Sequence, residues 1–372
     1  MATDDDATTA TIAGANLRQL PIRSNPDLDS FDIVKTYHRL LADDPELTMP
    51  VAAIEALIEA LGASSAKTVF ETMDLVKTQS DRLRRSPTVT NPMAVRHGTD
   101  LFQQYLVRSL KQPPSGSGAG VGAGSTSGGN GNDDHEFEVV RQHLLRNGRL
   151  FAARAKEARE KIALVGRHLI ADNYTILTHG GSRVVGTLLE RAAEAVPGDA
   201  PRRFKVIYAV SDNRQTESNK VIAALRAKGV PVATIPEGGV AHIMSKVKTV
   251  LVGAEVVTQQ GGIISRLGTY QIAKLAKADG KPFYVAAEQH KFGQTFPGDQ
   301  FSFGNDFEQN LLDFYSNKAH KKQNNTTEDK PQTESAAPLD FTPPELITSF
   351  ICDHGIKSTV AVEHEVIDMF VG

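Results

Sequence analysis

The sequence predicts an α/β protein in which an N-terminal helical bundle is followed by a Rossmann-like, doubly wound parallel sheet. Two observations favour this fold. Apolar residues recur at helical spacing through the first half of the chain, whereas short continuous apolar runs alternate with helical stretches in the second half. Continuous apolar strands separated by helices are typical of a parallel sheet that is covered on both faces. The expected strands are residues 174–177, 204–210, 232–235, 249–252 and 283–287.

The first half of the chain is expected to form a helical domain. Residues 1–29 hold few large apolar side chains and are predicted to be a disordered lead-in to a helical domain over residues 30–172. Pro50 lies where a helix would begin. A segment rich in Gly and Ser at about 112–134 has too little apolar surface to offset its ordering entropy, so it is predicted to be a disordered insertion. Helical spacing over residues 151–169 then predicts a long helix that joins the two domains.

The second half, residues 173–372, is expected to be the Rossmann-like domain. A polar segment at about 318–338 is predicted to be a second disordered insertion. Beyond it the chain is expected to return to a helix through Pro343 and Pro344 and to close on the apolar residues 366–371. Helices between the strands are predicted at residues 184–195, 218–228, 240–244 and 265–278.

Composition limits the class of protein. A length of 372 residues exceeds what one core usually organises, which agrees with two domains. The net charge is −3 and there is no Trp, so we expect no direct nucleic-acid surface and no membrane surface. A single cysteine, Cys352, cannot form an internal disulfide and favours a reducing compartment. No apolar run approaches the roughly 20 residues of a membrane span, and the acidic start lacks a signal-peptide core, so we expect the cytosol.

The first candidate site is a glycine pair, Gly261 and Gly262, between the strand at 249–252 and a helix that is expected to begin near Ser265. Ligands of α/β sheets bind outside the carboxyl ends of the strands, and free amides at a helix start attract anions. Between Glu255 and Arg266 there is no Asp, Glu, His, Cys or Lys. The loop is therefore predicted to hold an anion without transforming it.

The second candidate site is the sequence T-H-G-G-S-R, which follows the first predicted strand and opens the next helix. Glycines allow close backbone approach, a serine offers a hydroxyl and a helix N-cap, and an arginine suits phosphate. A plain strand-to-helix turn explains the pattern equally well, and the histidine is more easily explained as structural than as catalytic. The residues concerned are His179, Gly180, Gly181, Ser182 and Arg183.

The third candidate site contains Asp212 and Arg214, at the end of the strand predicted over 204–210. Asp212 would accept from sugar hydroxyls and Arg214 would bind phosphate or a neighbouring subunit, although a polar turn with an internal ion pair is the simpler interpretation. The dinucleotide fingerprint is missing from the first strand-to-helix turn, so no nicotinamide or flavin cofactor is expected. No metal-ligand spacing occurs either, so no metal is expected.

Four segments together resemble a known family. They read T-H-G-G-S-R-V-V, V-G-A-E-V-V-T-Q-Q-G-G-I-I-S-R-L-G-T-Y, K-P-F-Y-V-A-A-E-Q-H-K-F and F-T-P-P-E-L-I-T. Over residues 31–371 the chain resembles the alpha subunits of eukaryotic translation initiation factor 2B. The wider family includes isomerases of methylthioribose 1-phosphate and ribose 1,5-bisphosphate, with a helical N-terminal domain and a Rossmann-like C-terminal domain.

The resemblance implies that catalysis has been lost. Those isomerases carry a catalytic cysteine at the position of Gly180 and a catalytic aspartate at the position of Gly262, and both residues are glycine here. Their Asn-Lys pair corresponds to Ser265 and Arg266, so a cation is kept.

The function implied by the resemblance is regulatory and non-enzymatic. It implies a homodimer that bridges beta, gamma, delta and epsilon subunits of the exchange factor for initiation factor 2, and that helps to sense the phosphorylated alpha subunit of initiation factor 2. No cofactor is expected, and the former active site is expected to bind a sugar phosphate or a nucleoside monophosphate. The alternative is an active sugar-phosphate isomerase that uses His179 or Asp212 in place of the lost groups.

Overall fold

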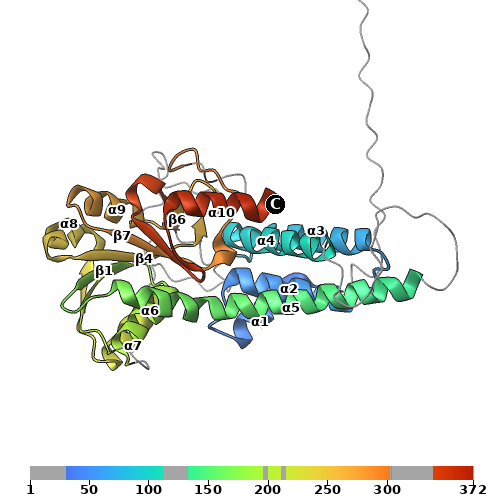
Figure 1. Ribbon diagram of the computed structural model, residues 1–372, viewed down its shortest axis with the longest axis horizontal. Coiled ribbons are helices and arrows are strands. Elements are labelled where there is room, and N and C mark those ends of the chain that lie inside the picture. The colour runs from blue at the N-terminus through green and yellow to red at the C-terminus, as the bar shows by residue number, and fades with distance from the viewer. Residues whose placement is uncertain are drawn as a thin grey trace, which may run out of the picture.

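The computed structural model describes residues 31–111, 133–195, 200–210, 215–301, 303 and 338–371. A bundle of long helices stands beside an α/β domain (Figure 1), so the predicted fold class is confirmed. The three segments predicted to be disordered, 1–29, about 112–134 and about 318–338, lie outside the described residues, except for Asp133, Asp134 and Pro338.

The helical bundle is built around α2, whose apolar residues are buried on nearly every side. Pro50 occupies its first turn as predicted, where a missing amide hydrogen does no harm. Helices α1 and α3 are capped by Asp32 and Thr68, whose side chains accept from backbone amides at 3.1 Å. The bundle comprises α1 (Ile33–Asp43), α2 (Met49–Ala63), α3 (Val69–Arg84), α4 (Pro92–Lys111) and α5 (Asp133–Gly166).

Helix α5 joins the two halves of the molecule, which confirms the predicted connecting helix. It runs for 34 residues along the bundle and into the α/β domain (Figure 1). Leu144 and Ala152 are buried in the bundle core, whereas Ile162 and Ala163 near its end are buried with the sheet. No helix in the described part of the chain is both long and apolar enough to cross a membrane.

The main sheet has seven strands in the order β10-β9-β7-β4-β1-β2-β3. All neighbours are parallel except β10, which runs antiparallel to β9 at the edge. The five predicted strands are confirmed. Strands such as β4 are buried on both faces and therefore show themselves as continuous apolar runs, whereas β3 is a partly exposed edge strand. The strands are β1 (Thr175–His179), β2 (Lys205–Val210), β3 (Val232–Pro236), β4 (Thr249–Gly253), β7 (Phe283–Ala286), β9 (Ser349–Cys352) and β10 (Gly355–Lys357).

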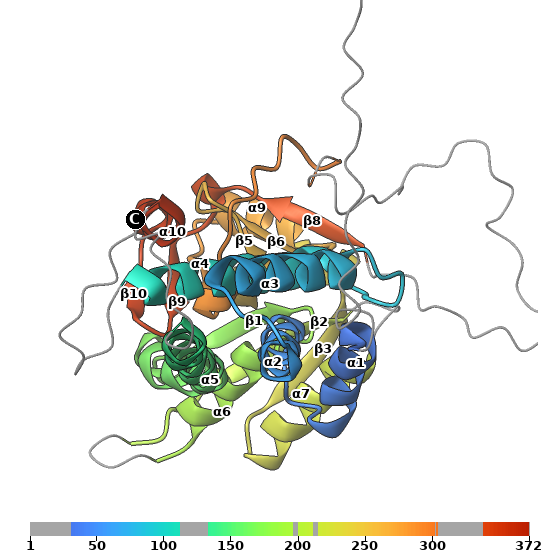
Figure 2. The same cartoon turned by 90° about the vertical axis from the view of Figure 1, so that its right-hand side faces the viewer.

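Helices cover both faces of this sheet (Figure 2). Along β1, Ile176 joins the core under α6, α7 and the end of α5, whereas its neighbour Leu177 joins the core under α8, α9 and α10. This alternation follows from the pleat of the strand. The covering helices are α6 (Arg183–Ala193), α7 (Gln215–Ala227), α8 (Val240–Ile243), α9 (Thr269–Ala278) and α10 (Thr359–Val371).

A second sheet of three strands corrects the prediction of a helix that begins near Ser265. It consists of β5 (Val256–Val257), β6 (Ile263–Arg266) and β8 (Leu339–Thr342). Ser265 and Arg266 lie in β6 and not at a helix start, because β6 pairs antiparallel with β8 and places Ser265 opposite Asp340. Helix α9 begins only at Thr269, after Gly268 in the left-handed conformation.

The predicted return to a helix through Pro343 and Pro344 is wrong. These residues follow β8, and only a short 3-10 turn, Pro344–Leu346, separates them from β9. Instead, β8 pairs with β6 and β9 pairs with β7, so the backbone of this region forms the hydrogen bonds of two sheets. The closing helix α10 includes the predicted apolar stretch but starts earlier, at Thr359.

Gly98 of α4 allows the bundle to close and gives a test of its packing. A Cβ at this position would lie 2.6 Å from the Cβ of Pro50, so Gly98→Ala must push α2 and α4 apart. We expect this change to lower the free energy of unfolding by about 1–3 kcal/mol, as overpacking does. The matched control is Gly62→Ala in α2, where no atom lies within 4 Å of the new Cβ. It should be neutral or stabilising by up to about 1 kcal/mol. Urea unfolding measures both, and equal midpoints would contradict this account of the packing.

Candidate functional site

A cavity of about 450 Å³ lies outside the carboxyl ends of β1 and β4. These strands are neighbours, and the chain leaves β1 toward β2 on one side and returns to β4 on the other. Such a switch point leaves a crevice at the edge of the sheet, which is the usual ligand site of doubly wound folds. The turn between α1 and α2, at residues 45–48, covers the cavity from the bundle side.

The turn from β1 to α6 forms one wall of the cavity. Gly180 has φ +84 and Gly181 has φ +69, a backbone conformation that side chains disfavour. A Cβ at Gly180 would touch Arg266, 3.3 Å from its Cγ, and one at Gly181 would lie 3.0 Å from the Cβ of Glu217. The backbone thus approaches β6 and α7 closely because both positions are glycine.

Ser182 occupies the N-cap position of α6, but its side chain makes no capping hydrogen bond. The predicted capping role of this hydroxyl is therefore wrong. Its Oγ lies 2.1 Å from where a Cβ at Gly253 would be, so the side chain packs against the end of β4 instead. This contact holds the two loops of the switch point together.

Arg183 ties the sheet to the bundle. Its Nη1 donates to the backbone oxygen of Pro45 at 3.0 Å and to that of Leu47 at 3.2 Å, both in the turn between α1 and α2. The sequence predicted that the Arg183 guanidinium binds a phosphate, but in the structure it donates to two backbone carbonyl oxygens.

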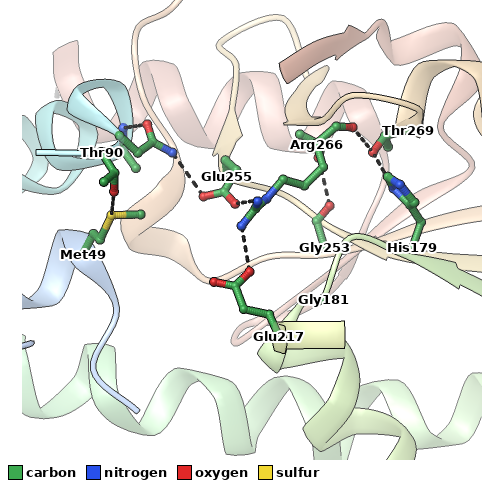
Figure 3. A network of polar contacts seen from close by, with 12 residues as sticks. Met49, Thr90, His179, Gly181, Glu217, Gly253, Glu255, Arg266 and Thr269 are labelled. Carbon is green, nitrogen blue, oxygen red and sulfur yellow. Dashed lines mark hydrogen bonds and ion pairs between the residues drawn. The ribbon is translucent and has the colours of Figure 1, made fainter. Parts of the chain in front are cut away.

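Arg266 lies at the centre of an ionic network that Figure 3 shows. Its Nε donates to Glu255 at 3.3 Å and its Nη2 donates to Glu217 at 2.9 Å. The second oxygen of Glu255 accepts from the Asn91 amide of the bundle at 3.2 Å. Ser265 precedes Arg266 in β6 and is buried. The Ser265 hydroxyl donates to the backbone oxygen of Gly253 at 3.0 Å. The network therefore joins β6, α7, the loop after β4 and the bundle.

His179 has a partner on each ring nitrogen. Nε2 lies 2.6 Å from a carboxylate oxygen of Glu237, and Nδ1 lies 3.3 Å from the hydroxyl of Thr269. Only 3% of the residue is exposed. These contacts fit the structural interpretation of this histidine better than a catalytic one.

Gly261 and Gly262 do not line the cavity. They form the turn between β5 and β6, where the Gly261 amide donates to the Thr258 oxygen at 3.0 Å and the Gly262 amide donates to the Thr258 hydroxyl at 3.1 Å. The prediction of free amides leading into a helix is therefore wrong. A Cβ at Gly262 would lie 2.7 Å from the ring of Phe341, so this glycine allows β8 to pack closely.

Two predicted residues remain, and two residues of the wall were not predicted. Asp212 and Arg214 lie outside the described residues. Sequence reasoning missed Glu217 and Glu255, which the structure places beside Arg266. Glu255 stands two residues after Gly253, so its position beyond a strand end was a signal for it, whereas nothing in the sequence indicates the partner of Glu217.

Glu288 and Lys291 form an ion pair in the wall of the cavity. Burial would raise the pKa of Glu288, but the Lys291 ammonium at 2.8 Å outweighs this effect and lowers the pKa to about 2. The only cysteine, Cys352, is buried in β9 and does not line the cavity, and burial raises its pKa. Among the described residues no cluster of His, Cys, Asp and Glu could hold a metal ion.

Asp340 of β8 lies opposite Ser265 of β6 and binds the first backbone amides of α9. Its Oδ2 accepts from the Gly268 amide at 2.7 Å and from the Tyr270 amide at 3.0 Å, so it caps α9. Burial raises the pKa of Asp340 to about 7, although these two amides oppose the shift.

The raised pKa of Asp340 predicts a pH dependence of stability. The folded state holds the proton more tightly than the unfolded state, whose pKa is 3.8. The resulting stabilisation is complete below about pH 4 and is lost as the pH rises to about 7, with a magnitude of roughly 2–4 kcal/mol. Asp340→Asn keeps the acceptor and should flatten this part of the profile. Urea unfolding of both proteins from pH 4 to pH 8 measures it, and parallel profiles would show that Asp340 does not titrate in this range.

The comparisons with known proteins agree in family and fold. Residues 42–359 match the model of the initiation factor 2 subunit family. A Dictyostelium discoideum protein, translation initiation factor eIF2B subunit alpha, is 29% identical, and the match covers 93% of this chain and 98% of that protein. The ribose 1,5-bisphosphate isomerase of Archaeoglobus fulgidus is 34% identical over 42% of this chain and 48% of its own length.

A solved structure gives the same fold. It is the crystal structure of the tetrameric eIF2B-beta2-delta2 complex from C. thermophilum, with a TM-score of 0.65 and 18% identity. The match covers 92% of this chain and 97% of that chain. At this identity the likeness supports the architecture of helical bundle and α/β domain only.

Proposed function

Because this chain belongs to the initiation factor 2 subunit family, we propose that it is a non-catalytic, alpha-like regulatory subunit of the guanine nucleotide exchange factor for initiation factor 2. The likeness to an alpha subunit extends over nearly the whole of both chains, whereas the likeness to the isomerase covers less than half of each. The proposed place of action is the cytosol.

The absence of a thiol from the described wall, together with the engagement of its one histidine, carries this proposal. Gly180 has a positive φ, which would strain any other residue, and a Cβ at Gly262 would lie 2.7 Å from the ring of Phe341, so the backbone or its neighbours must rearrange before either position can carry the isomerases' thiol or carboxylate. His179 is engaged at both nitrogens. An active isomerase that relies on His179 would first have to break its bond to Glu237. The geometry therefore favours binding over turnover.

The cavity is proposed to keep a ligand-binding role. Its volume of about 450 Å³ lies in the range of small-molecule sites, and it occupies the switch point of the sheet. Arg266 and Lys220 in its wall suit a phosphate group, and the carboxylate of Glu255 suits hydroxyls. A sugar phosphate or a nucleoside monophosphate combines these two features.

The proposed partners follow from the family and find support on two surfaces. Ile356 in the edge strand β10 and Val360 in α10 are 47% and 58% exposed, as expected where a second copy packs in a homodimer. Lys77 in the middle of α3 and Arg85 at its C-cap are exposed cations, which suit the phosphorylated alpha subunit of initiation factor 2. The beta, gamma, delta and epsilon subunits are the remaining proposed partners.

Assembly tests this function without reference to the cavity. We expect the purified chain to form a dimer, with a mass close to twice 40.2 kDa by light scattering at micromolar concentration. Adding it to a tetramer of the beta, gamma, delta and epsilon subunits should join two of these tetramers into one assembly. The release of GDP from initiation factor 2 should then become sensitive to the phosphorylated alpha subunit of that factor. Ile356→Glu should weaken the dimer, and Leu164→Glu, an equally exposed apolar position on α5, is the matched control. The proposal is contradicted if the chain is a monomer and if adding it changes neither the mass of the tetramer nor its rate of GDP release.

A further inference from the structure

Arg266 is the cation most directly placed to receive an anion in the cavity. Its side chain rises from the end of β6 beneath Gly180, with Cγ 3.3 Å from where a Cβ of that glycine would stand. Only 20% of the side chain is exposed. Its guanidinium is held by Glu217 and Glu255, which neutralise it (Figure 3). A ligand anion that binds the guanidinium through Nη2 therefore competes with the Glu217 carboxylate.

The two carboxylates are held differently. Glu255 is 25% exposed, and its second oxygen is fixed by the Asn91 amide. Glu217 stands in the first turn of α7 and its side chain is 49% exposed. A carboxylate that is half in water can leave the guanidinium at little cost in hydration, whereas a more buried carboxylate cannot. Glu217 is therefore the exchangeable partner.

We propose that Glu217 competes with the ligand for Arg266. Its carboxylate binds Arg266 when the cavity is empty and releases it when a phosphate monoester binds. This inference rests on the proposed ligand-binding function of the cavity. The incoming phosphate takes the place of the Glu217 carboxylate on Nη2, and Glu217 turns into solvent while Glu255 keeps Nε. A phosphate dianion wins this exchange because it carries more charge than a carboxylate and accepts from the guanidinium fork.

The exchange makes Glu217 a specificity-determining residue. A neutral sugar brings no charge to replace the carboxylate and gains nothing from Arg266. A phosphate monoester in the wild-type chain gains the guanidinium only after breaking an existing ion pair. Removing the competing charge should therefore tighten the binding of phosphates and leave the binding of neutral sugars unchanged.

The test measures the affinity of the full-length chain for ribose 5-phosphate by calorimetric titration, with ribose as the neutral probe. Glu217→Gln keeps the shape of the side chain and should bind ribose 5-phosphate about three- to tenfold more tightly than wild type, because a half-exposed ion pair is weak but the like charge also disappears. The matched control is Glu190→Gln, which removes a carboxylate from the same wall without touching Arg266. Its affinity should change less than about twofold.

A double-mutant cycle with Arg266→Gln separates the ion pair from a general effect of charge. The gain from Glu217→Gln should vanish in the Arg266→Gln background. The proposal is overturned if wild type binds and Glu217→Gln binds equally or more weakly, if Glu190→Gln gains as much, or if the gain survives without Arg266. In those three cases the cavity still binds phosphates. If no variant binds ribose 5-phosphate, both the competitor and the ligand-binding role fail, while the mass of the assembly still reports on the regulatory function.

Discussion

The close approach of two loops at the switch point of the sheet is the constraint on which the rest of the structure depends. The Ser182 side chain fills the space that a Cβ would take at Gly253. Any larger residue at position 253 would push the turn after β1 away from the end of β4 and open the floor of the cavity. Because α6 begins at that turn, the same contact brings Arg183 within reach of the carbonyl oxygens of Pro45 and Leu47. The bundle is thereby held over the sheet edge.

Three cations in the cavity wall already have partners within the protein. Arg183 bonds to carbonyl oxygens, Arg266 to two carboxylates, and Lys291 to the buried Glu288. A ligand must exchange partners with these groups, and two of the groups, Arg183 and Glu255, also bond to the bundle. Binding at the sheet edge can therefore alter the contacts between the domains, which suits a subunit that regulates an assembly better than one that turns over a substrate.

Local sequence was enough to predict five strands of the main sheet and the connecting helix, but not β9 and β10. Strands such as β4 are buried on both faces and stand out as apolar runs, and α5 carries a helical repeat of buried positions. The second sheet could not be predicted, because β6 acquires its strand conformation by pairing with β8, which lies more than 70 residues later in the chain. The glycine pair at Gly261 and Gly262 looked like a strand-to-helix loop for the same reason. At the cavity, the turn from His179 to Arg183 was found from its place after a strand, whereas the partners of Arg183 and Arg266 depend on tertiary packing that no spacing reveals.

As a member of the initiation factor 2 subunit family, this chain is proposed to bind a ligand in its cavity without isomerising it. Phosphorus NMR of the purified chain with methylthioribose 1-phosphate or ribose 1,5-bisphosphate tests this claim most directly. The account predicts no isomerised product above a protein-free sample over several hours. Steady conversion that copurifies with the chain and disappears in the His179→Asn variant would contradict it.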